Sequence, residues 1–114
     1  MIVRIWRTEI DPARADDYLR FARSKSLPMF REQRGFAGVL FAATETQRAV
    51  ITLWRDLTAV DALDDSPTYK ATTEEIEATG FLRGQSTVEV LELEGVVLDP
   101  KALSQEIGCG RSLQ

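Results

Sequence analysis

The sequence predicts an α+β fold in which a four-stranded antiparallel sheet carries two helical regions on one face. Four segments have the alternating or apolar pattern of strands, and two longer segments have apolar residues at helical spacing. Their order along the chain is β-α-β-β-α-β, and right-handed crossovers place both helical regions on the same side of the sheet. This arrangement is a ferredoxin-like protomer.

The first strand is predicted at residues 2–9, and both of its faces carry apolar side chains. One face presents Val3 and Ile5, and the other presents Ile2 and Trp6. A strand of this kind is expected to be covered on both sides.

The first helical region is predicted to begin at Asp11-Pro12 and to end near Gly35, because an N-cap followed by proline starts a helix and glycine often ends one. Pro28 is expected to kink this helix. The buried stripe is predicted to contain Ala15, Tyr18 or Leu19, Ala22, Leu27 and Phe30.

Two further strands should form an antiparallel hairpin. Residues 36–43 are apolar on both faces of the predicted strand, and the polar residues 44–48 have the length of a hairpin loop. The stretch 49–69 then reads as a strand that ends in Trp54 and turns directly into a helix.

The second helical region is predicted from Asp56, as N-cap, to about Thr79, followed by Gly80. Ser66-Pro67 should interrupt it and start a new helical turn. Residues 87–93 alternate as the last strand.

Length and composition indicate one domain. With 114 residues, 44% of them hydrophobic and 28% charged, the chain is typical of one compact globular unit. We expect this domain at residues 1–95 and a tail at 96–114. The tail should hold a short helix between Asp99-Pro100 and Gly108, lying on a partner subunit or fraying, with disorder from Gly110 and an unpaired thiol at Cys109.

Charge and hydropathy exclude several classes of partner. The formal net charge is −4 and no basic stripe is present, so nucleic acid is not an expected partner. The sequence lacks the apolar run of a membrane span and the pattern of a signal peptide, and we expect a cytoplasmic protein.

The absence of histidine is the sharpest chemical constraint. With no histidine and one cysteine, the chain cannot use Ser-His-Asp or Cys-His catalysis, or histidine-bound zinc or haem. The glycine-rich phosphate-loop motifs are also missing. We therefore expect no haem, structural metal or other cofactor, and any chemistry falls to carboxylates, lysine, tyrosine and arginine.

Apolar residues on both faces of the predicted strands indicate a homodimer. Two helical regions cover only one sheet face, and the other face would expose a larger apolar patch than monomers usually tolerate. A second copy of the chain is expected to cover it.

The chain resembles the antibiotic biosynthesis monooxygenase-like domains over roughly residues 2 to 94. The resemblance rests on the opening IVRIW, Asp17-Tyr18 in the first helix, Leu27-Pro28, Gly35-Phe36-Ala37-Gly38, and Leu53-Trp54-Arg55-Asp56-Leu57 followed by Ala59-Val60. It implies a dimeric α+β barrel. It also implies that Trp54 lines a pocket between sheet and helices, where some members of the family oxidise polycyclic aromatics without metal or flavin.

The chain departs from two groups within this family. Haem-degrading members have a histidine near where Thr72 and Thr73 stand and an asparagine close to Trp6, and this chain has neither. Many relatives also carry histidine and tyrosine in the last strand, where this sequence reads Val90-Leu91. Haem degradation is thus excluded, and histidine-assisted proton transfer has no counterpart.

The candidate site residues are aromatic or acidic. Trp54 and Tyr69 bracket one helix, and each has a packing interpretation beside the functional one. Glu89 lies between two valines and could act as a base after desolvation, or could face solvent or pair with Arg4 or Arg7. The predicted catalytic set is Trp54, Tyr69 and Glu89, and the predicted ligand-binding set is Phe41, Thr52, Trp54, Tyr69 and Phe81.

Two functions remain open from the sequence. The first is a cofactor-independent monooxygenase of a phenolic polycyclic aromatic, whose own carbanion would activate oxygen. The second is a non-catalytic homodimer of the same fold that binds a small aromatic molecule, because fold does not fix function.

Overall fold

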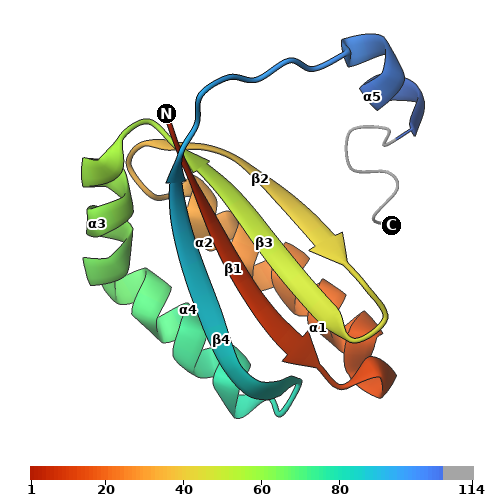
Figure 1. The fold of residues 1–114 in the computed structure, drawn as a ribbon. Coiled ribbons are helices and arrows are strands. Elements are labelled where there is room, and N and C mark those ends of the chain that lie inside the picture. The colour runs from red at the N-terminus through yellow and green to blue at the C-terminus, as the bar shows by residue number, and fades with distance from the viewer. Residues whose placement is uncertain (107–114) are drawn as a thin grey trace.

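The computed structural model describes residues 1–106 and contains one four-stranded antiparallel sheet (Figure 1). The strands lie in the order β2-β3-β1-β4. Their bounds are β1 (Ile2–Ile10), β2 (Phe36–Ala43), β3 (Gln47–Trp54) and β4 (Leu82–Glu92). The predicted ferredoxin-like α+β protomer is confirmed.

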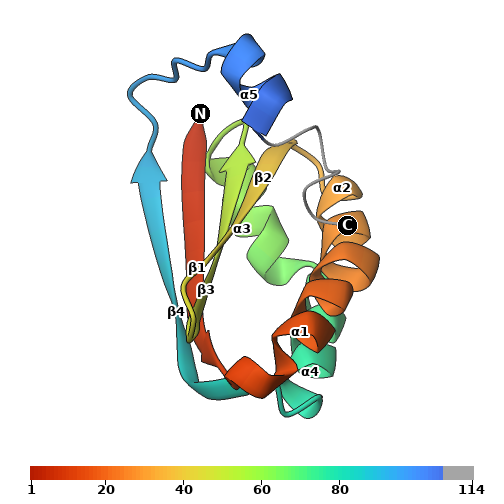
Figure 2. The same cartoon turned by 90° about the vertical axis from the view of Figure 1, so that its right-hand side faces the viewer.

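Helices α1 to α4 pack on one face of the sheet (Figure 2). The first helical region consists of a 3-10 turn (Pro12–Arg14), α1 (Ala15–Phe21), a π-helical turn (Ala22–Ser26) and α2 (Leu27–Arg31). The second consists of α3 (Leu57–Asp65) and α4 (Pro67–Ala78). Both regions therefore lie on the same side, as the crossover rule predicts.

The π-helical turn accounts for the irregularity expected at Pro28. Proline lacks the N–H of the helical ladder and its ring clashes with the carbonyl one turn earlier, so the backbone before it widens. The sequence predicts that the helix ends near Gly35, but in the structure it ends at Arg31. Gly35 instead has a φ of +82°, and a Cβ at this position would lie 2.5 Å from Cβ of Ala59 on α3.

The break between α3 and α4 is built as the sequence predicts. Oδ1 of Asp56 accepts a hydrogen bond from the N–H of Ala59 at 2.9 Å and caps α3. The hydroxyl of Ser66 accepts from the N–H of Tyr69 at 3.3 Å and caps α4, whose first turn begins with Pro67. This second cap places Tyr69 in the first turn of α4, beside the sheet.

Two strands begin earlier than predicted. β4 begins at Leu82 and not at residue 87, because Gly84, with a φ of +71°, and a register shift opposite Arg7 and Glu9 hide the alternation there. β3 begins at Gln47, so the hairpin loop is shorter than residues 44–48. Strand pairing continues through polar residues at both places.

The register of β1 decides which side chains face the helices. Cross-strand partners share a face, and Ile2, Arg4 and Trp6 lie opposite Trp54, Thr52 and Val50 of β3. Ile2 and Trp6 pack against a core cluster whose buried members are Met29, Phe30, Val50, Trp54, Ala59, Val60 and Leu63. A second cluster at the other end of the sheet holds Ile10, Tyr18, Phe21, Ala22, Ile76 and Phe81.

Helices α1 to α4 leave the opposite face of the sheet open. Within residues 1–106, no helix packs against that face (Figure 1). Register places Ile5, Leu40, Ile51, Leu53 and Leu91 on this face. Leu40 and Leu91 are exposed in the single chain. We call these five residues the open-face patch.

The tail leaves the sheet after Glu92 and ends, within the described residues, in the short helix α5 (Pro100–Glu106). Asp99 caps α5 by accepting from the N–H of Lys101 at 3.0 Å, so the predicted terminal helix is confirmed. Val97 and Leu98 are exposed before it. The predicted stop at Gly108, the thiol of Cys109 and the segment from Gly110 lie outside the described residues.

None of the helices in residues 1–106 has the length and apolar character needed to cross a bilayer.

We predict that Thr52→Val lowers the free energy of unfolding by about 1–3 kcal/mol. The indole N–H of Trp54 donates to Oγ1 of Thr52 at 2.8 Å, and both side chains are buried. Valine keeps the volume but leaves the indole donor unpaired. Urea unfolding measures the loss, and Thr58→Val, at an exposed position on α3, is the control that should stay within about 0.5 kcal/mol. Equal effects of the two variants would contradict the prediction.

We predict that stability falls as the pH rises from about 10 to about 12 because of Tyr18. Burial raises the pKa of the Tyr18 phenol to about 12, against the opposing effect of Arg48. A phenol in the unfolded chain ionises near pH 10, so the folded state binds more protons across this window. The stabilisation is complete below pH 10, and about 2–3 kcal/mol of it disappears by pH 12.

Unfolding in urea at several pH values checks the Tyr18 prediction, with Tyr18→Phe as the control. Lysine and arginine also titrate in this range, so the informative quantity is the difference between wild type and Tyr18→Phe. A difference that does not change with pH would refute the role of Tyr18.

Candidate functional site

Arg4 and Tyr69 form the polar centre of the candidate site. Nη2 of Arg4, on β1, donates a hydrogen bond to the hydroxyl oxygen of Tyr69, on α4, at 2.7 Å. The guanidinium carbon also lies 5.2 Å from the centre of the Tyr69 ring, within cation–π range. Because the tyrosine oxygen accepts from Arg4, its own proton is free to be donated elsewhere.

The Arg4 side chain is buried although it is charged. It is only 4% exposed, and Nη2 lies 3.5 Å from Oδ1 of Asp64, the one carboxylate that pairs with it in residues 1–106. The Asp64 side chain is 56% exposed, at the solvent side of α3. The positive charge is therefore partly compensated, and from one side only.

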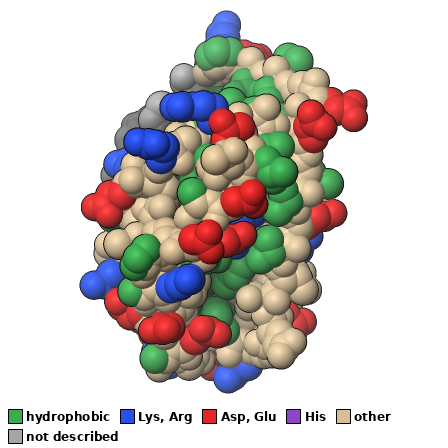
Figure 3. Space-filling view, turned by 90° about the vertical axis from the view of Figure 1, so that its left-hand side faces the viewer, with side chains coloured by type: hydrophobic (Ala, Val, Ile, Leu, Met, Phe, Trp, Pro, Cys, Tyr) green, Lys and Arg blue, Asp and Glu red, His purple; other side chains and the backbone are tan. Residues whose placement is uncertain are grey.

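An apolar strip, formed by Trp6, Val88 and Val90, continues from Arg4 along the helix-facing side of the sheet. Val90 is the cross-strand partner of Arg4, and Val88 is the partner of Trp6. Val88 and Val90 are 51% and 43% exposed, because the helices leave the edge strand β4 partly uncovered. Figure 3 shows this side of the molecule, where hydrophobic side chains gather in a band with acidic groups beside it.

Trp54 and Thr52 lie behind this surface, inside the core. Trp54 has no exposed surface, and its ring packs edge-on against Phe30 and Phe36 with centroid distances of 6.4 and 5.8 Å. Thr52 accepts the indole N–H and donates to the backbone carbonyl of Arg4 at 3.3 Å. Both residues therefore support the strand that carries Arg4, and neither reaches the surface as a pocket wall would. The indole that is partly exposed on this face belongs to Trp6.

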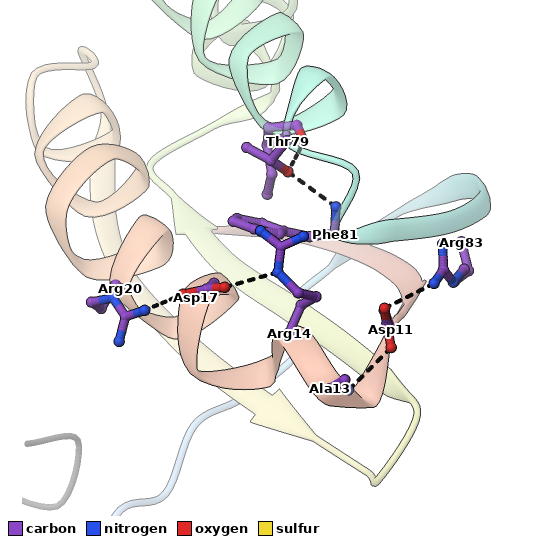
Figure 4. A network of polar contacts seen from close by, with 9 residues as sticks. Asp11, Ala13, Arg14, Asp17, Arg20, Thr79, Phe81 and Arg83 are labelled. Carbon is purple, nitrogen blue, oxygen red and sulfur yellow. Dashed lines mark hydrogen bonds and ion pairs between the residues drawn. The ribbon is translucent and has the colours of Figure 1, made fainter.

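Phe81 lies in the second core cluster, away from Trp54. Figure 4 shows the guanidinium of Arg14 over its ring, with 4.7 Å between the guanidinium carbon and the ring centre. Nε of Arg14 donates to Asp17 at 2.8 Å, and this hydrogen bond lowers the pKa of the Asp17 carboxyl. Phe81 is thus packed between the core and a polar network, and a ligand beside Tyr69 would not touch it.

Phe41 contributes to a separate cavity between α1 and the hairpin of β2 and β3. The cavity has a volume of about 240 Å³ and is lined mainly by small apolar side chains, together with Tyr18, Phe41 and Arg48. Pockets for drug-sized ligands are usually larger, at about 300–1,000 Å³. The cavity is thus smaller than a typical ligand pocket and separate from the contact between Arg4 and Tyr69.

Glu89 lies on the open face of the sheet. It pairs with Ile5 in the register and its carboxylate forms an ion pair with Arg7 at 3.1 Å, with both side chains about half exposed. The interpretation of Glu89 as a partner of Arg7 is therefore confirmed. Because Tyr69 and Arg4 meet on the opposite face, Glu89 is separated from them by the sheet.

Sequence reasoning brought Tyr69 into the site but missed Arg4 as a site residue. The available signal was the alternation of β1, which puts Arg4 on the same face as Ile2 and Trp6. A cation between two apolar residues on one strand face is either snorkelling or specifically paired. Within residues 1–106 no cluster of three or more His, Cys, Asp or Glu side chains could hold a metal ion.

The fold is shared with several solved structures, although neither a family model nor a curated protein matches the sequence. An antibiotic biosynthesis monooxygenase superposes with a TM-score of 0.67 and 18% identity, covering 83% of this chain and 100% of the other. The monooxygenase from the ActVA-Orf6 gene of Streptomyces coelicolor, solved with the ligand nanaomycin D, gives 0.70 and 19%, with coverages of 86% and 91%. SnoaB, a cofactor-independent oxygenase from Streptomyces nogalater, gives 0.65 and 16%, with coverages of 86% and 97%.

These similarities extend over most of the chain at low identity, so they concern the arrangement of the backbone and not the site residues. The resemblance drawn from the sequence motifs is confirmed at that level. The chain has the fold of the antibiotic biosynthesis monooxygenases.

Proposed function

We propose that this chain is a cofactor-independent monooxygenase that acts on a phenolic polycyclic aromatic molecule. The observation that carries the proposal is the Tyr69 hydroxyl, held at 2.7 Å by the buried Arg4 beside the apolar strip of Trp6, Val88 and Val90. A flat ring system would lie on the strip, and its oxygen would face the Tyr69 proton. The shared fold with a cofactor-independent oxygenase and with a monooxygenase bound to nanaomycin D supports this reading.

The proposed reaction uses the electrons of the substrate. A CH₂ carbon that is conjugated with the ring carbonyl through the aromatic rings, as in anthrone, loses a proton to a base from the solvent. The resulting carbanion, delocalised onto the carbonyl oxygen, reduces dioxygen. The peroxide that forms on this carbon then loses water and leaves a carbonyl, so one molecule of O₂ yields the new carbonyl oxygen and one H₂O. The Tyr69 hydroxyl and the Arg4 charge would stabilise the anion on the substrate oxygen, and the apolar strip would hold the ring system in place.

The second candidate is a non-catalytic homodimer that binds an aromatic molecule at the same surface. The positions of two carboxylates favour it: Glu89 lies across the sheet, and Asp64, the carboxylate that pairs with Arg4, is more than half exposed. Neither carboxylate therefore lies enclosed beside the proposed ring site, in contact with the carbon that would lose the proton. Under this alternative the surface binds the ring system without turnover.

We predict that the purified protein consumes oxygen with anthrone in the absence of added metal, flavin or nicotinamide. Tyr69→Phe should lower kcat about a hundredfold, because it removes one donor to the developing oxyanion. Tyr18→Phe, which alters a tyrosine outside the proposed site, should leave the rate unchanged. An oxygen electrode and the anthraquinone absorbance measure the reaction.

Binding of anthrone without oxygen uptake would favour the second candidate. Equal rates for Tyr69→Phe and wild type would remove Tyr69 from the mechanism. Trp54→Ala is not an informative variant, because emptying a fully buried indole site costs about 3–5 kcal/mol of stability.

For either function, we propose a homodimer that buries the open-face patch. We predict that Leu40→Lys shifts the protein from dimer to monomer, because it would bury a charge between two sheets. Leu57→Lys is the matched control, since Leu40 and Leu57 are 53% and 54% exposed in the single chain but Leu57 lies on α3. Sedimentation velocity reports the state, and a wild-type protein that stays monomeric at micromolar concentration would disprove the dimer.

A further inference from the structure

The guanidinium of Arg4 has an unused hydrogen-bond donor. In the part of the chain that the structure describes, Nε of Arg4 is the only buried side-chain nitrogen or oxygen of a non-exposed residue without a hydrogen-bond partner. Buried polar groups are almost always paired, and a buried charge with an open donor is costly. A buried donor of this kind calls for an acceptor that the described residues do not supply, such as a water or a ligand group.

The open donor lies on the edge of the guanidinium that binds carboxylates side-on. Nε and Nη2 share this edge, and a carboxylate can accept from both through two parallel hydrogen bonds. At present Nη2 donates to the neutral Tyr69 hydroxyl at 2.7 Å and makes only a long contact of 3.5 Å with Asp64. The edge therefore faces one weakly held, largely exposed carboxylate and no buried one.

We propose that Arg4 is the receptor for an acidic group, so that the site takes planar aromatic acids. This inference rests on the proposed location of the ligand, on the apolar strip. The ligand carboxylate binds the Nε and Nη2 edge of Arg4 and displaces Asp64 toward water. The Tyr69 hydroxyl, which accepts from Nη2, donates its proton to the same carboxylate or to a neighbouring ring oxygen.

The register also sets the length of the ligand. The pair Arg4–Val90 is followed on the same face by the pair Trp6–Val88. Successive residues on one strand face are about 7 Å apart, so a carboxylate at Arg4 puts the adjoining rings over Val90 and against Val88 and Trp6. Two or three fused rings match this distance.

Binding of 2-naphthoate and its neutral analogue 2-naphthamide, measured by titration calorimetry at pH 7, tests the proposal. The two probes share the ring system and differ in charge. The wild-type protein should bind the acid about tenfold more tightly or better, as expected for charge-assisted hydrogen bonds. Equal affinities, or no binding of naphthoate near its solubility limit, would overturn the proposal.

Two variants separate recognition from a structural role of Arg4. Arg4→Met keeps the volume and removes the buried charge. The Asp64 carboxylate that loses its partner is 56% exposed, so the change leaves no unpaired charge buried. It should fold and bind both probes equally. Asp64→Asn removes the competing carboxylate, and it should tighten naphthoate several-fold while leaving naphthamide unchanged. An acid preference that persists in Arg4→Met, or an Asp64→Asn variant with no tighter naphthoate binding, would refute the assignment.

The outcomes for acid recognition and for oxygenase activity are distinguishable. Oxygen uptake with anthrone but no preference for naphthoate would leave the monooxygenase proposal standing and remove the Arg4 receptor. A preference for naphthoate that depends on Arg4, without oxygen uptake, would leave an acid-binding protein. If the protein neither consumes oxygen with anthrone nor prefers naphthoate, the surface around Arg4 and Tyr69 is not the ligand site.

Discussion

The pairing of β1 with β3 on one edge and with β4 on the other is the constraint on which the structure depends. It places Ile2, Arg4 and Trp6 under the helices and Ile5 on the open face. A shift by one residue would exchange the two sets and would put Arg4 on the open face. The core, the polar centre and the open-face patch therefore all follow from one register, which is held by hydrogen bonds on both sides of the central strand.

Most of the fold could be predicted because its signals are local. Asp56 and Ser66 cap the helices that follow them, and the apolar run of β2 has the bounds that the pattern indicates. The predicted boundaries are wrong where tertiary contacts override the local sequence pattern. β4 extends through Gly84 because the end of β1 lies beside it, and the first helix stops at Arg31 because Gly35 must pass close to α3.

The site was harder to predict, because it depends on which strand face is covered and how deeply. Alternation groups Trp54 with Thr52 but does not reveal that both are completely enclosed. Trp54 was expected to line a pocket, and the structure places it inside the core. Glu89 and Tyr69 are each plausible in isolation, yet the sheet separates them. Arg4 becomes visible as a site residue only when its 4% exposure and its contact with Tyr69 are known together.

The overall charge makes the position of Arg4 more informative. The chain carries a formal net charge of −4, so its long-range field does not attract an anion. At physiological ionic strength this field is screened over about 8 Å, whereas a buried guanidinium acts at hydrogen-bond distance in a medium of low dielectric constant. Selection between an acid and its neutral analogue must then come from the short-range contacts of Arg4 with Tyr69 and Asp64. In the proposed complex, the exposed valines of β4 would supply affinity for the rings, and the charge of Arg4 under α3 and α4 would supply the orientation.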